Sequence, residues 1–275
     1  MKDFSDPVDH GTAMESASAR SSQLEDSPTK HRGRLGVRLG LLGVASILPA
    51  SWTPWVLRNI FGYRIGPGVR IGLSIIEARS CEIGGGTVIG HGNLFLDMGN
   101  LKIGAGCRIG HLNLFRGGSR VSIGDNTKIL RLNVINSMHT PVAATQTEAT
   151  FSLGDGSAVT EGHRIDFTDR VSIGTGTVLA GRHSSLWTHA RDEYGPIEIG
   201  NLCYIGSESR FAPNSRIPSD SVVGMGSVVV AEFDTPGFLI GGVPARILEA
   251  LDEDKRSLLR AVGERNSKRR HIDAS

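Results

Sequence analysis

The sequence predicts an all-β solenoid, in which short parallel strands wind in successive coils. An aliphatic residue followed by Gly recurs at 20-residue intervals with one longer gap, and another aliphatic residue follows each six positions later. From residue 199 to residue 229 a large apolar residue stands at every sixth position. This spacing is too sparse for an amphipathic helix and too slow for strand alternation. Such self-similarity is typical of a solenoid, whose coils bury apolar side chains against the coils above and below.

The segment before the repeats divides into two parts. Residues 1–34 are rich in Ser, Asp, Glu and Lys, a composition that predicts a disordered polar tail. Residues 35–62 begin with an apolar stretch that is too short to span a bilayer. They are predicted to form a helical cap over the first coil, and a weak membrane-surface association through residues 35–61 is the alternative.

The repeats define a solenoid domain over residues 63–247. Two polar loops interrupt it, at residues 136–150 and 186–198, and long loops in a compact solenoid are more often functional than not. After residue 247, apolar residues recur at helical spacing between charged ones. Residues 248–275 are therefore predicted to form a C-terminal amphipathic helix followed by a basic tail.

Composition excludes several classes of protein. The formal charge is +2 from 30 basic and 28 acidic residues, so nothing indicates a nucleic-acid partner. The three cysteines are odd in number and far apart, which suggests neither a disulfide framework nor a zinc motif. A reducing compartment, the cytoplasm, is expected. The 36 glycines fit corners at which the backbone needs a positive φ.

The repeat also predicts which polar residues stack. Residues 20 apart lie at nearly the same angle on successive coils, about 4.8 Å apart. Ten positions after each restart stands a polar residue, and these are Asn93, Asn113, Asn133, His163 and His183. The asparagines predict a structural ladder, whereas the two histidines lie beside a long loop and are candidates for function. The same arithmetic places Asp169 one coil beneath His189.

The motifs resemble those of hexapeptide-repeat acyltransferases, in particular the sugar and polysaccharide O-acetyltransferases. The resemblance rests on the repeats, on Ile165-Asp166, and on Trp187-Thr188-His189 before Pro196-Ile197-Glu198-Ile199-Gly200. It implies a left-handed parallel β-helix. It also implies that His189 is a general base, with His183 as second choice, and that Asp166 or Asp169 orients the imidazole or holds the acceptor hydroxyl. Trp187 and Tyr194 suit stacking on a sugar, and His163 is a further candidate for acceptor binding.

The acyl donor is inferred from the same resemblance. Tyr204-Ile205-Gly206-Ser207, Gly224-Met225-Gly226-Ser227 and Gly241-Gly242-Val243-Pro244-Ala245-Arg246 look like segments that line a coenzyme A groove. The implied contacts are Gly206, Ser207, Gly224, Met225, Gly226 and Arg246. Many relatives have Thr-Lys where this chain has Val230-Ala231, so one polar contact is missing. Acetyl-CoA is then a co-substrate with no tightly bound cofactor, and relatives form the groove between subunits of a homotrimer.

Three functions remain open on these grounds. The first is acyl-CoA-dependent O-acyl transfer, most simply of acetyl, to a sugar hydroxyl of a polysaccharide, lipopolysaccharide or glycosylated metabolite. Direct transfer with a His base is favoured because the chain has no G-x-S-x-G nucleophile motif. The second is a metal site of the γ-carbonic-anhydrase kind built from His163, His183 and His189, although their spacing departs from that pattern. The third is a non-catalytic β-helical assembly module.

Overall fold

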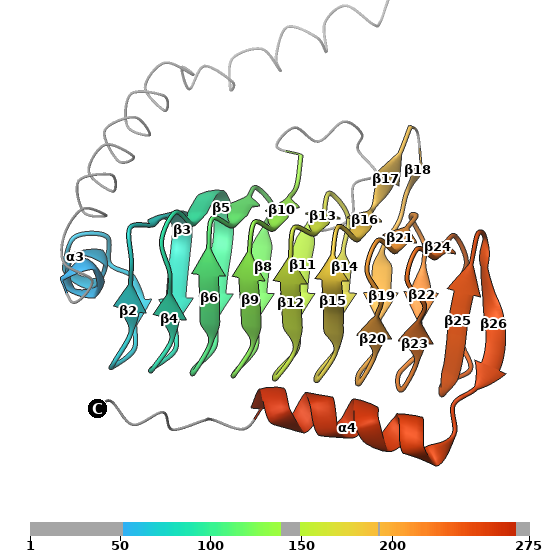
Figure 1. The fold of residues 1–275 in the computed structure, drawn as a ribbon. Coiled ribbons are helices and arrows are strands. Elements are labelled where there is room, and N and C mark those ends of the chain that lie inside the picture. The colour runs from blue at the N-terminus through green and yellow to red at the C-terminus, as the bar shows by residue number, and fades with distance from the viewer. Residues whose placement is uncertain (1–51, 139–148, 192, 268–275) are drawn as a thin grey trace, which may run out of the picture. The chain divides into compact units, whose positions relative to one another are not determined.

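Parallel strands wind into coils with three faces in the computed structural model, which describes residues 52–138, 149–191 and 193–267. Strands of successive coils pair in parallel, and only two hairpins among the described strands are antiparallel (Figure 1). The predicted β-solenoid is thus confirmed. Its left hand stays a prediction from the resemblance.

Each coil contributes strands to a first, a second and a third face in chain order. The first face contains β1 (Arg64–Ile65), β8 (Arg120–Ile123), β11 (Thr150–Leu153), β14 (Val171–Ile173), β19 (Ile197–Ile199) and β22 (Arg216–Ile217). The second contains β2 (Arg70–Ile71), β4 (Val88–Ile89), β6 (Arg108–His111), β9 (Lys128–Arg131), β12 (Ala158–Glu161), β15 (Val178–Arg182), β20 (Tyr204–Ile205), β23 (Val222–Val223), β25 (Phe238–Gly242) and β26 (Ala245–Ala250). The third contains β7 (Leu114–Arg116), β10 (Val134–Asn136), β13 (Arg164–Asp166), β16 (Ser185–Trp187), β21 (Arg210–Phe211) and β24 (Val228–Val229). The long strands β3 (Ile75–Ile83) and β5 (Leu94–Ile103) run from the third face into the first.

The aliphatic residues of the repeat form the core. On the first face Ile83, Ile103 and Ile123 pair in register and are buried, and the later members of the repeat behave alike. Complete burial of such a side chain contributes about 1.5–3 kcal/mol relative to exposure. One residue in six is therefore enough to hold successive coils together.

The asparagine ladder is also present. Asn113 Nδ2 donates to Asn93 Oδ1 at 2.9 Å, and Asn133 Nδ2 donates to Asn113 Oδ1 at 3.0 Å. The backbone N–H of His163 donates to Asn133 Oδ1 at 2.9 Å. These side chains are buried, so the ladder satisfies polar groups that would otherwise destabilise the coil.

The ends of the solenoid differ partly from expectation. Only α3 (Thr53–Asn59) is described within the expected cap, and residues 1–51 and the basic tail from 268 lie outside the described residues. The prediction of helix from residue 248 is wrong at its start. Ile247 and Leu248 belong to β26, which pairs antiparallel with β25 and covers the edge of the last coil. The helix α4 runs over Glu253–Ser267, and among the described helices none is long and apolar enough to cross a membrane.

Candidate functional site

The candidate site lies at the third corner, where the third face turns into the first. Asp166 ends β13, and β16 places Trp187 next to it on the following coil. The chain then continues through Thr188 into a hairpin of β17 (His189–Ala190) and β18 (Glu193–Tyr194). The loop expected over residues 186–198 therefore contains an ordered antiparallel pair.

A one-residue shift decides which carboxylate meets His189. The pairing of β12 with β15 changes register, so that Glu161 faces Arg182 rather than the residue 20 positions on. The next strands of the same two coils, β13 and β16, are therefore offset by 21 residues, as the pairing of Asp166 with Trp187 shows. The expectation that Asp169 lies beneath His189 is therefore wrong.

His189 instead forms a dyad with Asp166. Its Nδ1 lies 3.0 Å from Asp166 Oδ1, and Asp166 is buried with 2% of its surface exposed. Three more donors reach this carboxylate, namely Thr188 Oγ1 at 2.8 Å, Thr168 N at 3.1 Å and Thr168 Oγ1 at 3.2 Å. An ionised carboxylate only accepts, so this network assigns the proton to Nδ1 and leaves Nε2 as the basic nitrogen.

Two aromatic rings flank the imidazole. The centroid of Trp187 lies 6.2 Å from that of His189 in an edge-on arrangement, and Tyr194 lies 6.2 Å away in a stacked one. The guanidinium of Arg164 lies 5.7 Å from the Trp187 centroid, which adds a cation–π contact. Among the described residues no hydrogen-bond partner occupies His189 Nε2. The structure thus brings together four residues that the sequence indicated.

Asp169 supports this group without touching the imidazole. Its backbone N–H donates to Thr188 Oγ1 at 3.0 Å, and its Oδ1 accepts from Arg170 N at 2.6 Å. Thr188 therefore connects Asp169 with Asp166. Sequence reasoning did not single out Thr188 or Thr168.

His163 has a structural environment. It is 1% exposed, its Nδ1 accepts from Ser184 N at 3.1 Å, and its Nε2 lies 3.0 Å from Thr160 Oγ1. Burial, together with the nearby charge of His183, lowers the pKa of His163 to about 4, so the ring is neutral at pH 7. The prediction that it contacts an acceptor is not supported, because it lies inside the coil.

His183 is near His163 but lies outside the coil, and it belongs to a different corner from His189. It is exposed at the second corner, between the second and third faces, and has a φ of 62°. Ser184 takes the ladder position that the 20-residue period assigned to His183. The three histidines are thus separated: His163 lies in the interior, His183 at the second corner and His189 at the third. Among the described residues no group of three potential metal ligands gathers, so nothing in the geometry favours the metal site.

The segments expected to bind the acyl donor meet at the second corner of the last coils. Gly226 N donates to Ser207 O at 2.9 Å, which links the turn after β20 to the turn after β23. Gly224 N donates to Ile240 O at 2.9 Å, and Arg246 pairs with Gly241 on β25. A Cβ on Gly206 would collide with the backbone N of Met225, so only Gly permits this close approach. Met225 and Arg246 are exposed.

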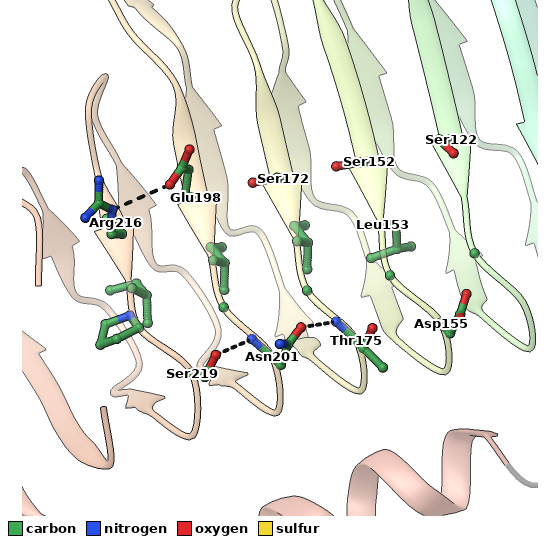
Figure 2. A pocket seen from close by; sticks show the side chains of 18 residues that line it. Ser122, Ser152, Leu153, Asp155, Ser172, Thr175, Glu198, Asn201, Arg216 and Ser219 are labelled. Atoms are coloured by element: carbon green, nitrogen blue, oxygen red, sulfur yellow. Dashed lines mark hydrogen bonds and ion pairs between the residues drawn. The ribbon is translucent and has the colours of Figure 1, made fainter. Parts of the chain in front are cut away.

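A hollow of about 600 Å³ lies on the first face (Figure 2). Its floor contains the paired column Ser122, Ser152 and Ser172, and Figure 2 shows Glu198 at the next position beside Arg216. Arg170, next to Asp169, forms an ion pair of 2.7 Å with Glu198. The sequence carries a signal for this hollow, since a Ser precedes the aliphatic residue of three restarts.

The chain is similar to known proteins in structure but not in sequence. No protein-family model matches the chain, and no curated protein matches it in sequence. Among solved structures, a UDP-N-acetylglucosamine acyltransferase from Campylobacter jejuni has 20% identity and a TM-score of 0.56, over 73% of this chain and 79% of that one. A hexapeptide-repeat acetyltransferase from Vibrio cholerae has 26% identity and a TM-score of 0.35, over 38% of this chain and 64% of that one.

A third similar structure is the polySia-specific acetyltransferase NeuO, with 18% identity and a TM-score of 0.44 over 68% of this chain and 80% of that one. The similarity to the Campylobacter protein extends through most of both chains. Together with the strand topology, it shows that this chain shares the parallel β-solenoid fold of that protein.

Proposed function

We propose that the chain is an acyl-CoA-dependent O-acyltransferase that transfers an acyl group, most simply acetyl, to a sugar hydroxyl. The observation that carries the proposal is the Asp166–His189 dyad between Trp187 and Tyr194. A buried carboxylate fixes the imidazole, and two aromatic rings beside it suit a sugar face. The related fold of a UDP-N-acetylglucosamine acyltransferase is compatible with this class of reaction.

The proposed reaction needs one proton carrier. The acceptor hydroxyl gives its proton to His189 Nε2 while its oxygen attacks the thioester carbonyl carbon. The C–S bond then breaks, and the leaving thiolate takes the proton from the imidazolium. Asp166 accepts the hydrogen bond from Nδ1 and stabilises the positive ring in between.

The donor is proposed to lie along the second corner. The backbone N–H groups of Gly206 and Gly226 are already engaged, whereas in the described part of the chain those of Ser207 and Met225 form no hydrogen bond. These two amides are the candidate donors for the developing oxyanion. Arg246, exposed nearby, is proposed to bind a coenzyme A phosphate.

A second copy of the chain is proposed to complete the site. Within one chain the dyad lies at the third corner, while the donor segments lie at the second. Strands of the third face separate these two corners. A homotrimer in which His189 faces the donor groove of a neighbouring subunit would resolve this separation.

The test is thiol release from acetyl-CoA with nucleotide sugars and short glycans as acceptors. His189→Ala is expected to lower kcat by about 10² to 10⁴-fold. Asp166→Asn, which keeps the shape but favours the wrong tautomer, is expected to lower kcat by about 10²-fold or more. His183→Ala is the matched control and should retain the wild-type rate.

Two outcomes would contradict the proposal. If His183→Ala is inactive while His189→Ala keeps its rate, the base is His183. If the wild-type protein releases no thiol with any acceptor and coenzyme A leaves its thermal stability unchanged, the chain is better explained as an assembly module.

A further inference from the structure

A second hollow, of about 710 Å³, occupies the N-terminal part of the first face. Four basic residues, Arg64, Arg79, Lys102 and Arg120, line it together with one carboxylate, that of Glu82. Ser80 and Asn100 add hydrogen-bonding groups, and Asn100 Nδ2 donates to Ser80 Oγ at 2.8 Å. We refer to it as the basic hollow.

The positive charge of the basic hollow is largely uncompensated. Arg64 forms an ion pair of 2.7 Å with Glu82. In the described ranges no carboxylate lies within ion-pair distance of Arg79, Lys102 or Arg120, and all three are exposed. The four cations outnumber the single carboxylate of Glu82, and a concave surface with an excess of positive charge attracts negatively charged ligands.

Strand register sets the spacing of these cations. Arg120 on β8 pairs with Asn100 on β5, and Lys102 follows Asn100 by two residues. Lys102 and Arg120 are therefore diagonal neighbours, with Cα atoms roughly 8 Å apart. This separation suits negative groups carried at intervals on one chain better than a single small anion.

The basic hollow continues into the hollow of Figure 2. Ser122 lines both of them. On the next coil, Thr150 of β11 pairs with Arg120. The following strand of this face is β14, and Arg170 immediately precedes it in the sequence. A polar surface thus runs from β5 to β14, about 14 Å at the usual strand spacing, and ends beside the corner that carries the dyad.

From this placement we propose that the basic hollow binds the negative groups of an extended acidic glycan, one of whose hydroxyls reaches His189. The assignment rests on the proposed acyl transfer and names the class of acceptor. The hollow is concave and lined by hydroxyl and amide groups, which suits a chain of sugars. A flat bilayer would contact the rims of the basic hollow rather than the side chains on its floor, so it fits this surface less well than a glycan does.

The experiment measures binding of the full-length protein to polygalacturonate by calorimetry, with neutral dextran as the uncharged control. The double variant Arg79→Ala/Arg120→Ala is expected to weaken polygalacturonate binding about tenfold, because two charge-assisted hydrogen bonds to the polymer are lost. Added salt should reduce wild-type binding further. Arg70→Ala/Arg108→Ala removes the same charge from exposed residues of the second face and should change binding less than twofold.

Several results would overturn the proposal. Equal weakening by both double variants would indicate general charge attraction, and unchanged binding in Arg79→Ala/Arg120→Ala would exclude the basic hollow. Competition by millimolar inorganic phosphate as strong as that by the polymer would indicate a simple anion site. Binding to anionic phosphatidylglycerol vesicles but not to polygalacturonate would indicate a membrane partner.

The binding assay contains no acyl donor, so its outcome is separate from that of the catalytic proposal. His189→Ala is measured for turnover, which it should lose, and Arg79→Ala/Arg120→Ala is measured for polygalacturonate binding, which it should weaken. If turnover depends on His189 but polygalacturonate binding is absent, only the acceptor class proposed here is wrong.

Discussion

His163 and His189 are both histidines of neighbouring coils, but their environments are opposite. His163 is enclosed by Ser184 and Thr160 within the coil, where both nitrogens have fixed partners. His189 has one nitrogen fixed by Asp166 and stands on a hairpin outside the coil. Residue type alone does not separate these cases. The difference arises because the coil interior supplies partners on every side.

The environment of His163 predicts a pH dependence of stability. Its pKa is about 4 in the folded chain against 6.5 for the free side chain, so unfolding at low pH takes up a proton. The stability contribution is complete above pH 6.5 and falls as pH drops from 6.5 toward 4. At pH 4.5 the loss should be about 2–3 kcal/mol in the free energy of unfolding.

Urea unfolding at pH 7.5 and 4.5 measures this loss. His163→Asn is the matched variant, because an amide continues the ladder of Asn93, Asn113 and Asn133 and carries no titrating group. Its stability should fall less between the two pH values than that of wild type. An equal fall in both proteins would show that His163 does not titrate on unfolding.

At the scale of elements, the period of the sequence predicted the strands and the ladder because both follow from equal coils. The 20-residue period gave the wrong neighbours for His189, because one coil has an extra residue. Leu179 and Leu186 are seven residues apart, whereas Val159 and Ile165 are six apart. This extra residue is the signal for the shift that brings Asp166 to His189. The antiparallel β26 gave no comparable signal, since its pairing depends on the open edge of the last coil.

The helix α4 stabilises the second face through one side. Leu259 is 7% exposed, whereas Leu258 is 60% exposed. Val262 packs against Ala158, Val178 and Ala180. Leu259→Ala should therefore lower the free energy of unfolding by about 1–3 kcal/mol, and Leu258→Ala by less than about 0.5 kcal/mol.

Chemical denaturation of the two leucine variants at pH 7.5 tests the packing of α4. The pair differs in burial but not in chemistry, so helix propensity changes equally in both. If the two variants lose the same stability, α4 does not pack on the solenoid through Leu259.

At the scale of the whole molecule, the faces and corners have different roles. The first face carries the two hollows, the second corner carries the proposed donor groove, and the third corner carries the dyad. The sequence indicated most of these residues but not their distribution over corners. That distribution depends on how the chain winds, which a list of motifs does not contain.

This distribution predicts complementation between inactive subunits. His189→Ala removes the base, and Arg246→Glu repels a coenzyme A phosphate, so each variant alone should have little activity. If each site combines the dyad of one subunit with the groove of the next, randomly mixed trimers should recover roughly a quarter of wild-type activity. Co-expression with two affinity tags, followed by the thiol-release assay, measures the recovery.

The control mixes His189→Ala with Asp166→Asn. Both changes lie in the same dyad, so every site in such a mixture contains one damaged dyad and no recovery is expected. Recovery in the first mixture but not in the second would establish sites shared between subunits. No recovery in either mixture of assembled trimers would mean that base and donor groove belong to one chain, and the separation of the second and third corners would then have to be closed by movement of the β17–β18 hairpin.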